Sequence, residues 1–340
     1  MEYKIIADGA CDLYGENADK IGVQIVPFYV AFEENVYKKE GAEIEVRHFY
    51  KEMVENPTVF PKTSMPSVQD YVDVFTPIVK AGEGVLCICI TTKFSGSYNS
   101  AVNARNMLLE DYPDAKIEVI DSTLNTVEEG IFVREAARMK AAGLSLEESV
   151  QALERIKSTG RIIFTVGSLD YLIHGGRIGK VLGGAVNMLG IKPMIVMQDG
   201  EIFSSGMARG RKKSIDKLLV QIKEHFTKNN LNANDYEIVV GYGYDYDEAV
   251  SFRDRLLESV KEYSDIISID IYQIGATVGV HTGPYPLGVG LLKKYEIKKC
   301  LLVTGHHVVR HSITQNVIKA LSVEGIHCDV CLRLQQYVVE

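Results

Sequence analysis

Short apolar runs alternate with amphipathic stretches along the first half of the chain. The apolar runs are typical of buried strands in a parallel sheet, and they cover residues 4–8, 23–32, 84–90 and 116–122. The stretches between them space their apolar residues as helices do, and they cover residues 68–80, 98–109, 128–142 and 146–157. This alternation predicts an α/β domain with a mostly parallel sheet flanked by helices, which we place at residues 1–163.

The pattern changes in the second half of the chain. Asp199-Gly200 lies between two β-rich runs and predicts a hairpin. Helical patterns then alternate with strand patterns, at residues 214–228, 237–243, 247–262 and 268–275. We expect an α+β domain of two layers over residues 164–292. Residues 293–340 read as an appended strand–helix–strand segment, or as strands that complete the first sheet.

Composition and charge exclude several classes of protein. The chain has 340 residues and a net charge of −8, and its only basic cluster is Arg209–Lys213, so general nucleic-acid binding is not expected. The N-terminus lacks a signal-peptide pattern, and no apolar run is long enough to span a bilayer. We therefore expect a cytoplasmic protein, and transient contact with a membrane surface stays open.

The cysteines give no strong metal signal. Cys328 and Cys331 form a single CxxC motif in a histidine-containing tail, and one such pair is weak evidence for zinc. We expect no metal site and no cofactor.

The first candidate for chemistry is the stretch TTKFSGSYNSA, which follows a buried strand and precedes a helix. Loops at this edge of an α/β sheet commonly bind ligands, and the N–H groups at a helix start attract anions. Ser95 and Ser97 add hydroxyl donors, and Gly96 permits close approach to the backbone. The alternative is that Ser95 or Ser97 merely caps the helix.

Three further stretches contain candidate polar groups. Thr63 and Ser64 lie in an apparent loop before Ser67, which we expect to cap a helix, and both are otherwise ordinary turn residues. Arg177 follows Gly175-Gly176 and precedes an apolar stretch, so it needs an anion, either an internal carboxylate or a ligand whose tail that stretch would line. His281 is expected at the end of an apolar strand, as a structural hydrogen-bonding residue or a ligand contact.

Motifs of common enzyme classes are absent from the sequence. It contains no GxxxxGK[ST] loop, no complete dinucleotide-binding fingerprint, no GxSxG and no HExxH. Ser95 and His281 could pair as nucleophile and base, but no orienting carboxylate follows at a recognisable spacing. A hydrolase or acyltransferase using this pair is the alternative to a non-catalytic protein.

In order and spacing, these motifs resemble those of the DegV family of bacterial fatty-acid-binding proteins over residues 1–292. The matching stretches are Asp8 with Asp12-Leu13, KTSMPS, FSGSYNSA, Asp121-Ser122, YLIHGGRIG, GIKP and VGVHTGP. The resemblance implies two α/β domains with a long-chain fatty acid in an apolar tunnel between them. It also implies a carrier that presents the carboxylate to the catalytic subunit of a fatty acid kinase and takes the acyl phosphate toward phospholipid synthesis.

By the same resemblance, seven residues bind the ligand and one faces the kinase. The ligand-binding set is Thr63, Ser64, Ser95, Gly96, Arg177, His281 and Thr282. Arg209 is the residue expected to face the kinase. The chain departs from the family pattern at Gly9-Ala10, where hydroxyl residues are usual, and at Glu128-Glu129, where small residues are usual. Residues beyond about 296 exceed the usual family length, which keeps a regulatory interaction protein as a third hypothesis.

Overall fold

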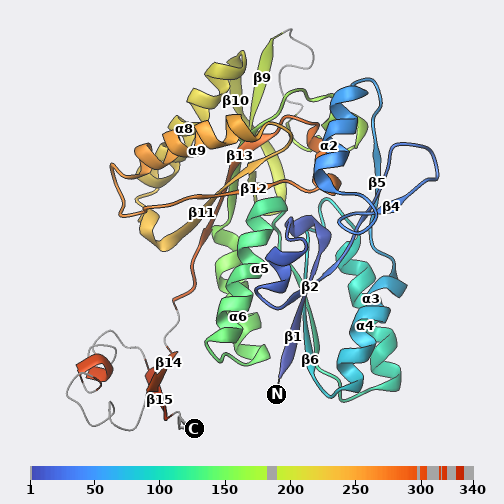
Figure 1. The fold of residues 1–340 in the computed structure, drawn as a ribbon, viewed down its shortest axis with the longest axis vertical. Coiled ribbons are helices and arrows are strands. Elements are labelled where there is room, and N and C mark those ends of the chain that lie inside the picture. The colour runs from blue at the N-terminus through green and yellow to red at the C-terminus, as the bar shows by residue number, and fades with distance from the viewer. Residues whose placement is uncertain are drawn as a thin grey trace, which may run out of the picture.

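A four-stranded parallel sheet forms the core of the first half of the chain (Figure 1). The computed structural model describes residues 2–181, 190–296, 299–304, 314, 316–319 and 327–332. The strand order is β2-β1-β6-β7, and the strands are β1 (Tyr3–Asp8), β2 (Val23–Val26), β6 (Gly84–Cys89) and β7 (Ile117–Asp121). All neighbours pair in parallel, as the apolar runs predict.

Helices cover both faces of this sheet (Figure 1). Ile6, Val85 and Cys87 pack under α3 (Val68–Lys80) and α4 (Ser97–Asp111). Ile5 and Leu86 point to the opposite face, where they pack under α5 (Thr126–Ala141) and α6 (Leu146–Ile156). Successive strand residues alternate between faces, so both faces are apolar and both are covered. The predicted helices are confirmed, and Ser67 caps α3 by accepting a hydrogen bond from the Asp70 N–H.

A small three-stranded sheet forms where the sequence predicts the end of one long strand and a loop. Residues 23–32 divide at Pro27 into β2 and β3 (Tyr29–Ala31), because proline cannot donate to a strand ladder. β3 pairs antiparallel with β4 (Lys38–Lys39) and β5 (Lys62–Ser64), so Thr63 and Ser64 lie on a strand. The remaining elements here are the short helices η1 (Gly9–Cys11) and α1 (Glu16–Asp19) and the longer α2 (Val46–Glu55).

A six-stranded mixed sheet forms the core of the second half, in the order β10-β9-β8-β13-β11-β12. The strands are β8 (Arg161–Thr165), β9 (Ile191–Gln198), β10 (Glu201–Arg209), β11 (Tyr236–Tyr242), β12 (Asp270–Gln273) and β13 (Leu287–Lys293). β9 and β10 form the hairpin predicted at Asp199-Gly200, where both residues have positive φ. β8 spans the expected boundary at residues 163/164 and belongs to this second sheet.

Helices cover one face of the second sheet. α8 (Arg211–Lys228) and α9 (Tyr246–Val260) pack through Leu218, Ile222 and Phe252. Short connections are η2 (Lys157–Thr159), α7 (Asp170–His174) and η3 (Ala233–Asp235). Helix α5 contacts β11 and β13 as well as the first sheet, and Arg134 on α5 pairs with Glu237 on β11 at 2.7 Å. α5 therefore connects the two halves.

The expectation of a strand before His281 is wrong, because residues 276–282 form helix α10. Buried carboxylates from distant parts of the chain satisfy the start of this helix. Asp12 accepts from the Gly275 N–H at 2.8 Å, and Glu40 accepts from the N–H groups of Ala276 and Thr277. Carboxylates at a helix N-terminus are favourable. These partners lie more than 230 residues away, so the local β-branched pattern does not reveal them.

The C-terminal segment forms a separate pair of strands in the described residues. β14 (Lys299–Thr304) and β15 (His327–Leu332) pair in parallel and lie apart from the two main sheets in Figure 1. The apolar stretch after Arg177 lies largely outside the described residues, at 182–189. Within the described parts of the chain, no helix is long and apolar enough to cross a membrane, and no cluster of His, Cys, Asp or Glu could hold a metal ion.

Candidate functional site: a two-ended cavity between the sheets

A buried carboxylate organises the turn that carries Ser95. Asp8, at the end of β1, accepts hydrogen bonds from the Ile90 N–H at 3.0 Å and the Ser97 hydroxyl at 2.7 Å. Burial raises the pKa of Asp8 to about 6, although these hydrogen bonds act in the opposite direction. The exit from β6 into α4 is therefore tied to the neighbouring strand.

Within this turn the two serines have different roles. Gly96, not Ser97, occupies the N-cap position of α4, so the cap interpretation of Ser97 is wrong. Ser97 is fully buried and bonded to Asp8 and Tyr71, at 2.7 Å and 2.6 Å. The Ser95 hydroxyl oxygen accepts from the Ser97 N–H at 3.2 Å. This leaves the Ser95 O–H group able to donate to a ligand.

Thr63 and His281 face each other across the site from different parts of the chain. The Thr63 hydroxyl oxygen on β5 lies 3.3 Å from Nε2 of His281 on α10. Nδ1 of His281 is buried and has no hydrogen-bond partner in the described structure. Burial, with a contribution from the positive charge of Arg177, lowers the pKa of His281 to about 4. The imidazole is therefore neutral near pH 7.

Gly175 explains how this histidine fits. A Cβ atom at position 175 would collide with the His281 ring, so glycine permits the close approach of α7 to α10. Gly176 follows with a φ of +66° and turns the chain toward Arg177. The two glycines thus place a cation beside the histidine.

Arg177 is exposed, and among the described residues its guanidinium binds only backbone carbonyls. Nε and Nη2 donate to the Phe94 carbonyl at 3.2 and 3.1 Å, and Nη1 donates to the Gly175 carbonyl at 2.7 Å. None of the ion pairs within the described ranges includes Arg177, so the internal salt bridge considered above is not found there. Its positive charge remains available to an anion next to Ser95.

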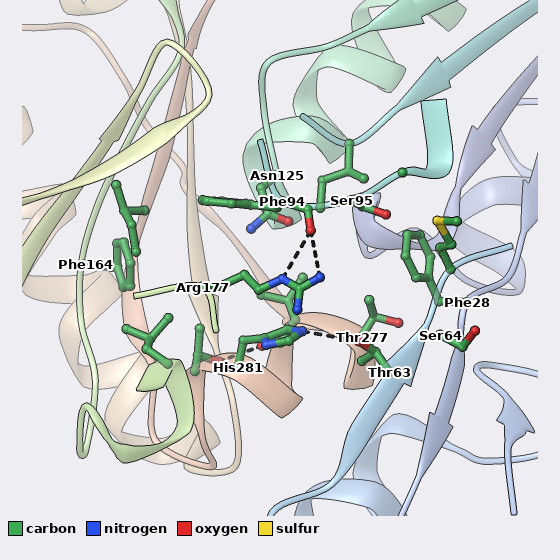
Figure 2. Close-up of a pocket in the computed structure, with 17 residues that line it drawn as sticks. Phe28, Thr63, Ser64, Phe94, Ser95, Asn125, Phe164, Arg177, Thr277 and His281 are labelled. Atoms are coloured by element: carbon green, nitrogen blue, oxygen red, sulfur yellow. Dashed lines mark hydrogen bonds between the residues drawn. The ribbon is translucent and has the colours of Figure 1, made fainter. Parts of the chain in front are cut away.

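These side chains line a cavity of about 300 Å³ between the two halves of the chain (Figure 2). Its polar wall contains all seven residues expected to bind a ligand, namely Thr63, Ser64, Ser95, Gly96, Arg177, His281 and Thr282. Its apolar wall is formed by Phe28, Ile90, Phe94, Phe164, Leu172, Ile202 and Val278. Such a combination of apolar surface and a few converging polar groups is typical of small-molecule sites.

A smaller cavity of about 40 Å³ adjoins the first. The two share five lining residues, Asn125, Phe164, Ile202, Val278 and Thr282. Apolar residues such as Val127, Met197 and Leu287 line most of the smaller cavity. The whole space therefore has a polar end and an apolar end.

Sequence reasoning missed two polar residues of this site, Asn125 and Thr277. Asn125 directly precedes α5 and looks like an ordinary helix cap in the sequence. Thr277 was hidden because its segment resembled a strand. Arg209 lies elsewhere, exposed at the end of β10, and does not line either cavity.

The geometry does not support a serine nucleophile. The His281 ring is bonded to Thr63, and Ser95 is bonded to the Ser97 N–H. No carboxylate in the described structure orients His281, because its Nδ1 atom has no partner. The arrangement of base and orienting acid that activates a serine is thus missing.

Comparison with known proteins identifies the family. A family model described as an uncharacterised protein of the DegV family matches residues 2–294. The chain belongs to the DegV family. A DegV domain-containing protein from Clostridium acetobutylicum is 33% identical, over 85% of this chain and 97% of that protein.

Solved structures of DegV proteins share the fold. A stearic-acid-binding protein from Eubacterium ventriosum is 44% identical, with a TM-score of 0.82 over 86% of this chain and 99% of that one. A fatty-acid-binding DegV protein from Thermus thermophilus is 25% identical, with a TM-score of 0.76 over 86% of this chain and 100% of that one. These descriptions are of binding proteins, which supports the expectation of a protein without catalytic activity.

Proposed function

We propose that this DegV protein binds one long-chain fatty acid between its two halves. The observation that carries this proposal is a pair of cavities with shared lining residues, with a cation and hydroxyl groups around the larger one and a mostly apolar lining around the smaller one. Each methylene group removed from water contributes about 0.8 kcal/mol. The apolar part of the cavity can thus supply most of the affinity, and the relatives described as fatty-acid-binding proteins support the same ligand class.

The polar end suits an ionised carboxylate, which only accepts hydrogen bonds. The Ser95 hydroxyl has its hydrogen free, because its oxygen already accepts from the Ser97 N–H. A neutral imidazole supplies one ring N–H, and the Thr63 hydroxyl lies beside it. The Arg177 guanidinium adds a positive charge without a neutralising carboxylate in the described structure, and charge-assisted hydrogen bonds are the stronger kind.

We further propose that the protein is a cytoplasmic carrier that presents the carboxylate to the catalytic subunit of a fatty acid kinase. Ser64 and Arg177 are exposed while lining the polar end, which supports access to the carboxylate from outside. Arg209 is exposed on β10 and bears a charge that a partner could contact. The acyl phosphate would then be carried toward phospholipid synthesis.

Calorimetric titration of the delipidated chain with stearic acid tests the binding proposal. We expect one site per chain, and an absence of binding would contradict the proposal. A fluorophosphonate probe tests the hydrolase alternative in the same preparation. We expect no labelling of Ser95, whereas labelling together with acyl-ester turnover would favour an enzyme.

Acyl phosphate formation by a reconstituted fatty acid kinase tests the partner proposal. Arg209→Ala should reduce turnover at least about tenfold, as expected for losing a charged interface contact, with fatty-acid affinity unchanged. Lys212→Ala is the matched control, since Lys212 is exposed in the same basic segment. Equal turnover of Arg209→Ala and the unmodified chain would contradict a role of Arg209 in the interface.

A further inference from the structure

Asn125 lies where the two cavities meet. It lines both the larger cavity, which contains the polar end, and the smaller apolar cavity. Figure 2 shows its carboxamide among the side chains around the larger cavity. A chain that runs from the polar end into the apolar end therefore passes this side chain.

The carboxamide of Asn125 has no partner within the described residues. Its Oδ1 atom is buried and accepts no hydrogen bond. Asn125 occupies the N-cap position of α5, where asparagine normally accepts from the N–H groups of the first turn, but its side chain forms no such bond. An amide at this place is unusual, because an unmatched polar group against methylene groups is costly.

The backbone of the next residue is strained, with φ +50° at Thr126. A β-branched residue rarely adopts this conformation. The Thr126 hydroxyl donates to the buried Asp12 carboxylate, which fixes the strained residue in place. Asn125 itself is extended, with φ −158° and ψ 159°. The backbone at the start of α5 is thus held in a conformation in which the Asn125 side chain does not bond the N–H groups of the helix and lines the two cavities instead.

Asn125 differs in this respect from the threonines around it. Thr282 donates to the Val278 carbonyl at 3.2 Å, Thr277 donates to Glu40, and Thr126 donates to Asp12. The hydrogens of all three hydroxyls are therefore already donated within the fold. Of the two polar side chains shared by the cavities, Thr282 has only acceptor capacity left, whereas Asn125 keeps its carboxamide donors and a buried acceptor without a partner in the described structure.

We propose that Asn125 recognises a hydroxyl group on the acyl chain, so that the site prefers a hydroxylated long-chain fatty acid. A hydroxyl group both donates and accepts, so it can satisfy Oδ1 and the amide N–H groups at once. A site with a polar group placed for a hydroxyl discriminates against the analogue that lacks it. This inference rests on the proposed fatty-acid binding and adds the chemical class of the acyl chain.

Competition between stearic acid and a series of monohydroxystearic acids on the full, delipidated chain tests this inference. When the hydroxyl group is at one position of the acyl chain or at a few neighbouring ones, the affinity for the hydroxylated acid should exceed that for stearic acid by about tenfold or more. Asn125→Leu, which is similar in size and apolar, should remove this ratio by strengthening stearic acid and weakening the hydroxylated acid. Asn103→Leu on the exposed face of α4 is the control and should leave the ratio unchanged.

Three results would overturn the inference. The first is that no hydroxylated acid, at any hydroxyl position, binds more tightly than stearic acid. The second is that the preference for the hydroxylated acid survives in Asn125→Leu. The third is that Asn125→Leu weakens the binding of both ligands equally, which would make Asn125 a carboxylate ligand. Asn125→Ala repeats the test if the leucine variant unfolds, as judged by circular dichroism. Failure of every fatty acid to bind is a different outcome, which would overturn the proposed function as well.

Discussion

At the scale of single residues, the polar end of the cavity depends on side chains with distinct duties. Asp8 and Ser97 position the turn, and Gly175 makes room for His281. Ser95, Arg177 and His281 keep hydrogen-bonding capacity or charge that the described fold does not use. We therefore expect that the proposed ligand contacts can be changed without loss of the fold.

Replacement of Arg177 tests this separation. Arg177→Ala should weaken stearic acid binding by about 10- to 100-fold, since a hydrogen bond to a charged group contributes about 1.5–3 kcal/mol. The melting temperature should change little, because the side chain is exposed. Arg105→Ala is the control and should alter neither quantity, because Arg105 is half-buried on α4, lines neither cavity and bonds only its neighbour Asn106 in the described structure. A loss of stability as large as the loss of affinity would contradict the assignment.

The pKa of His281 should respond to the ligand. In the free protein burial lowers the pKa of His281 and of His225 to about 4, so both rings are neutral at pH 7. A nearby carboxylate favours the charged imidazole and raises its pKa. NMR titration should therefore show an upward shift for His281 on binding stearic acid, while His225 on α8 stays at its value. Equal behaviour of the two rings would place the carboxylate elsewhere.

The resemblance of several short motifs to the DegV family singled out four residues at the polar end, although each motif alone had an ordinary structural reading. Thr63, Ser95, Arg177 and His281 stand beside glycine, proline or helix starts, and the structure brings them to one cavity. Their contact with a fatty acid stays a prediction. Asn125 could not be found in this way, since its importance depends on a missing cap bond and on the strained Thr126.

At the scale of elements, α10 depends on a carboxylate from outside the helix. Glu40 is 1% exposed and accepts from two backbone N–H groups and the Thr277 hydroxyl. Glu40→Ala should lower the free energy of unfolding by about 1–3 kcal/mol, because buried donors lose their acceptor. It should also weaken stearic acid binding, since α10 carries His281 and Thr282. Urea unfolding and calorimetry measure the two effects.

The exposed Glu45→Ala variant provides the comparison for Glu40, because Glu45 occupies the N-cap position of α2 but its side chain forms no cap hydrogen bond. If Glu40→Ala unfolds at the same urea concentration as Glu45→Ala, the carboxylate does not hold α10.

Helix α5 contains two buried glutamates without hydrogen-bond partners in the described structure, Glu128 and Glu129. Burial raises the pKa of both well above the usual value, and for Glu129 the charges of Asp8 and Asp12 add to this. A raised carboxyl pKa means that the folded state holds the proton longer than the unfolded state. The contribution to stability is therefore complete below about pH 4.5, the unfolded value, and is lost as the pH rises through the folded value.

Glu129→Gln should remove its share of this loss. Between pH 5 and 8 the variant should lose less free energy of unfolding than the unmodified chain, by about 1.4 kcal/mol for each pH unit up to the raised pKa of Glu129. Glu118→Gln on the exposed side of β7 should keep the original pH dependence. Parallel pH profiles for Glu129→Gln and the unmodified chain would show that Glu129 keeps an ordinary pKa.

At this scale, elements defined by local interactions were predicted from the sequence, and an element defined by contacts between distant residues was not. α3 and its Ser67 cap, the other helices on the first sheet and the hairpin at Asp199-Gly200 arise from local patterns, and all were predicted. α10 was not, because Asp12 and Glu40 define its start from the far end of the chain. The pattern around Thr63 predicts a loop, whereas the structure has a strand there, because β5 is only three residues long and its partner β3 is equally short.

At the scale of the whole molecule, the cavity lies where the two sheets meet. β5, the turn after β6 and the start of α5 contribute from the first half, and Arg177, β8, β10 and α10 contribute from the second. A fatty acid in this space contacts both halves, so its binding energy adds to the contact between them. The alternation of strands and helices predicted the first sheet and four strands of the second, but not β8 and β13. How the sheets meet depends on contacts across the whole chain.

The central claim is that one fatty acid fills this space, and native mass spectrometry of the chain purified from bacteria tests it most directly. We predict a mass above that of the polypeptide by one long-chain fatty acid, released on denaturation and restored by incubation with stearic acid. A mass equal to the bare polypeptide, both as purified and after that incubation, would contradict the account.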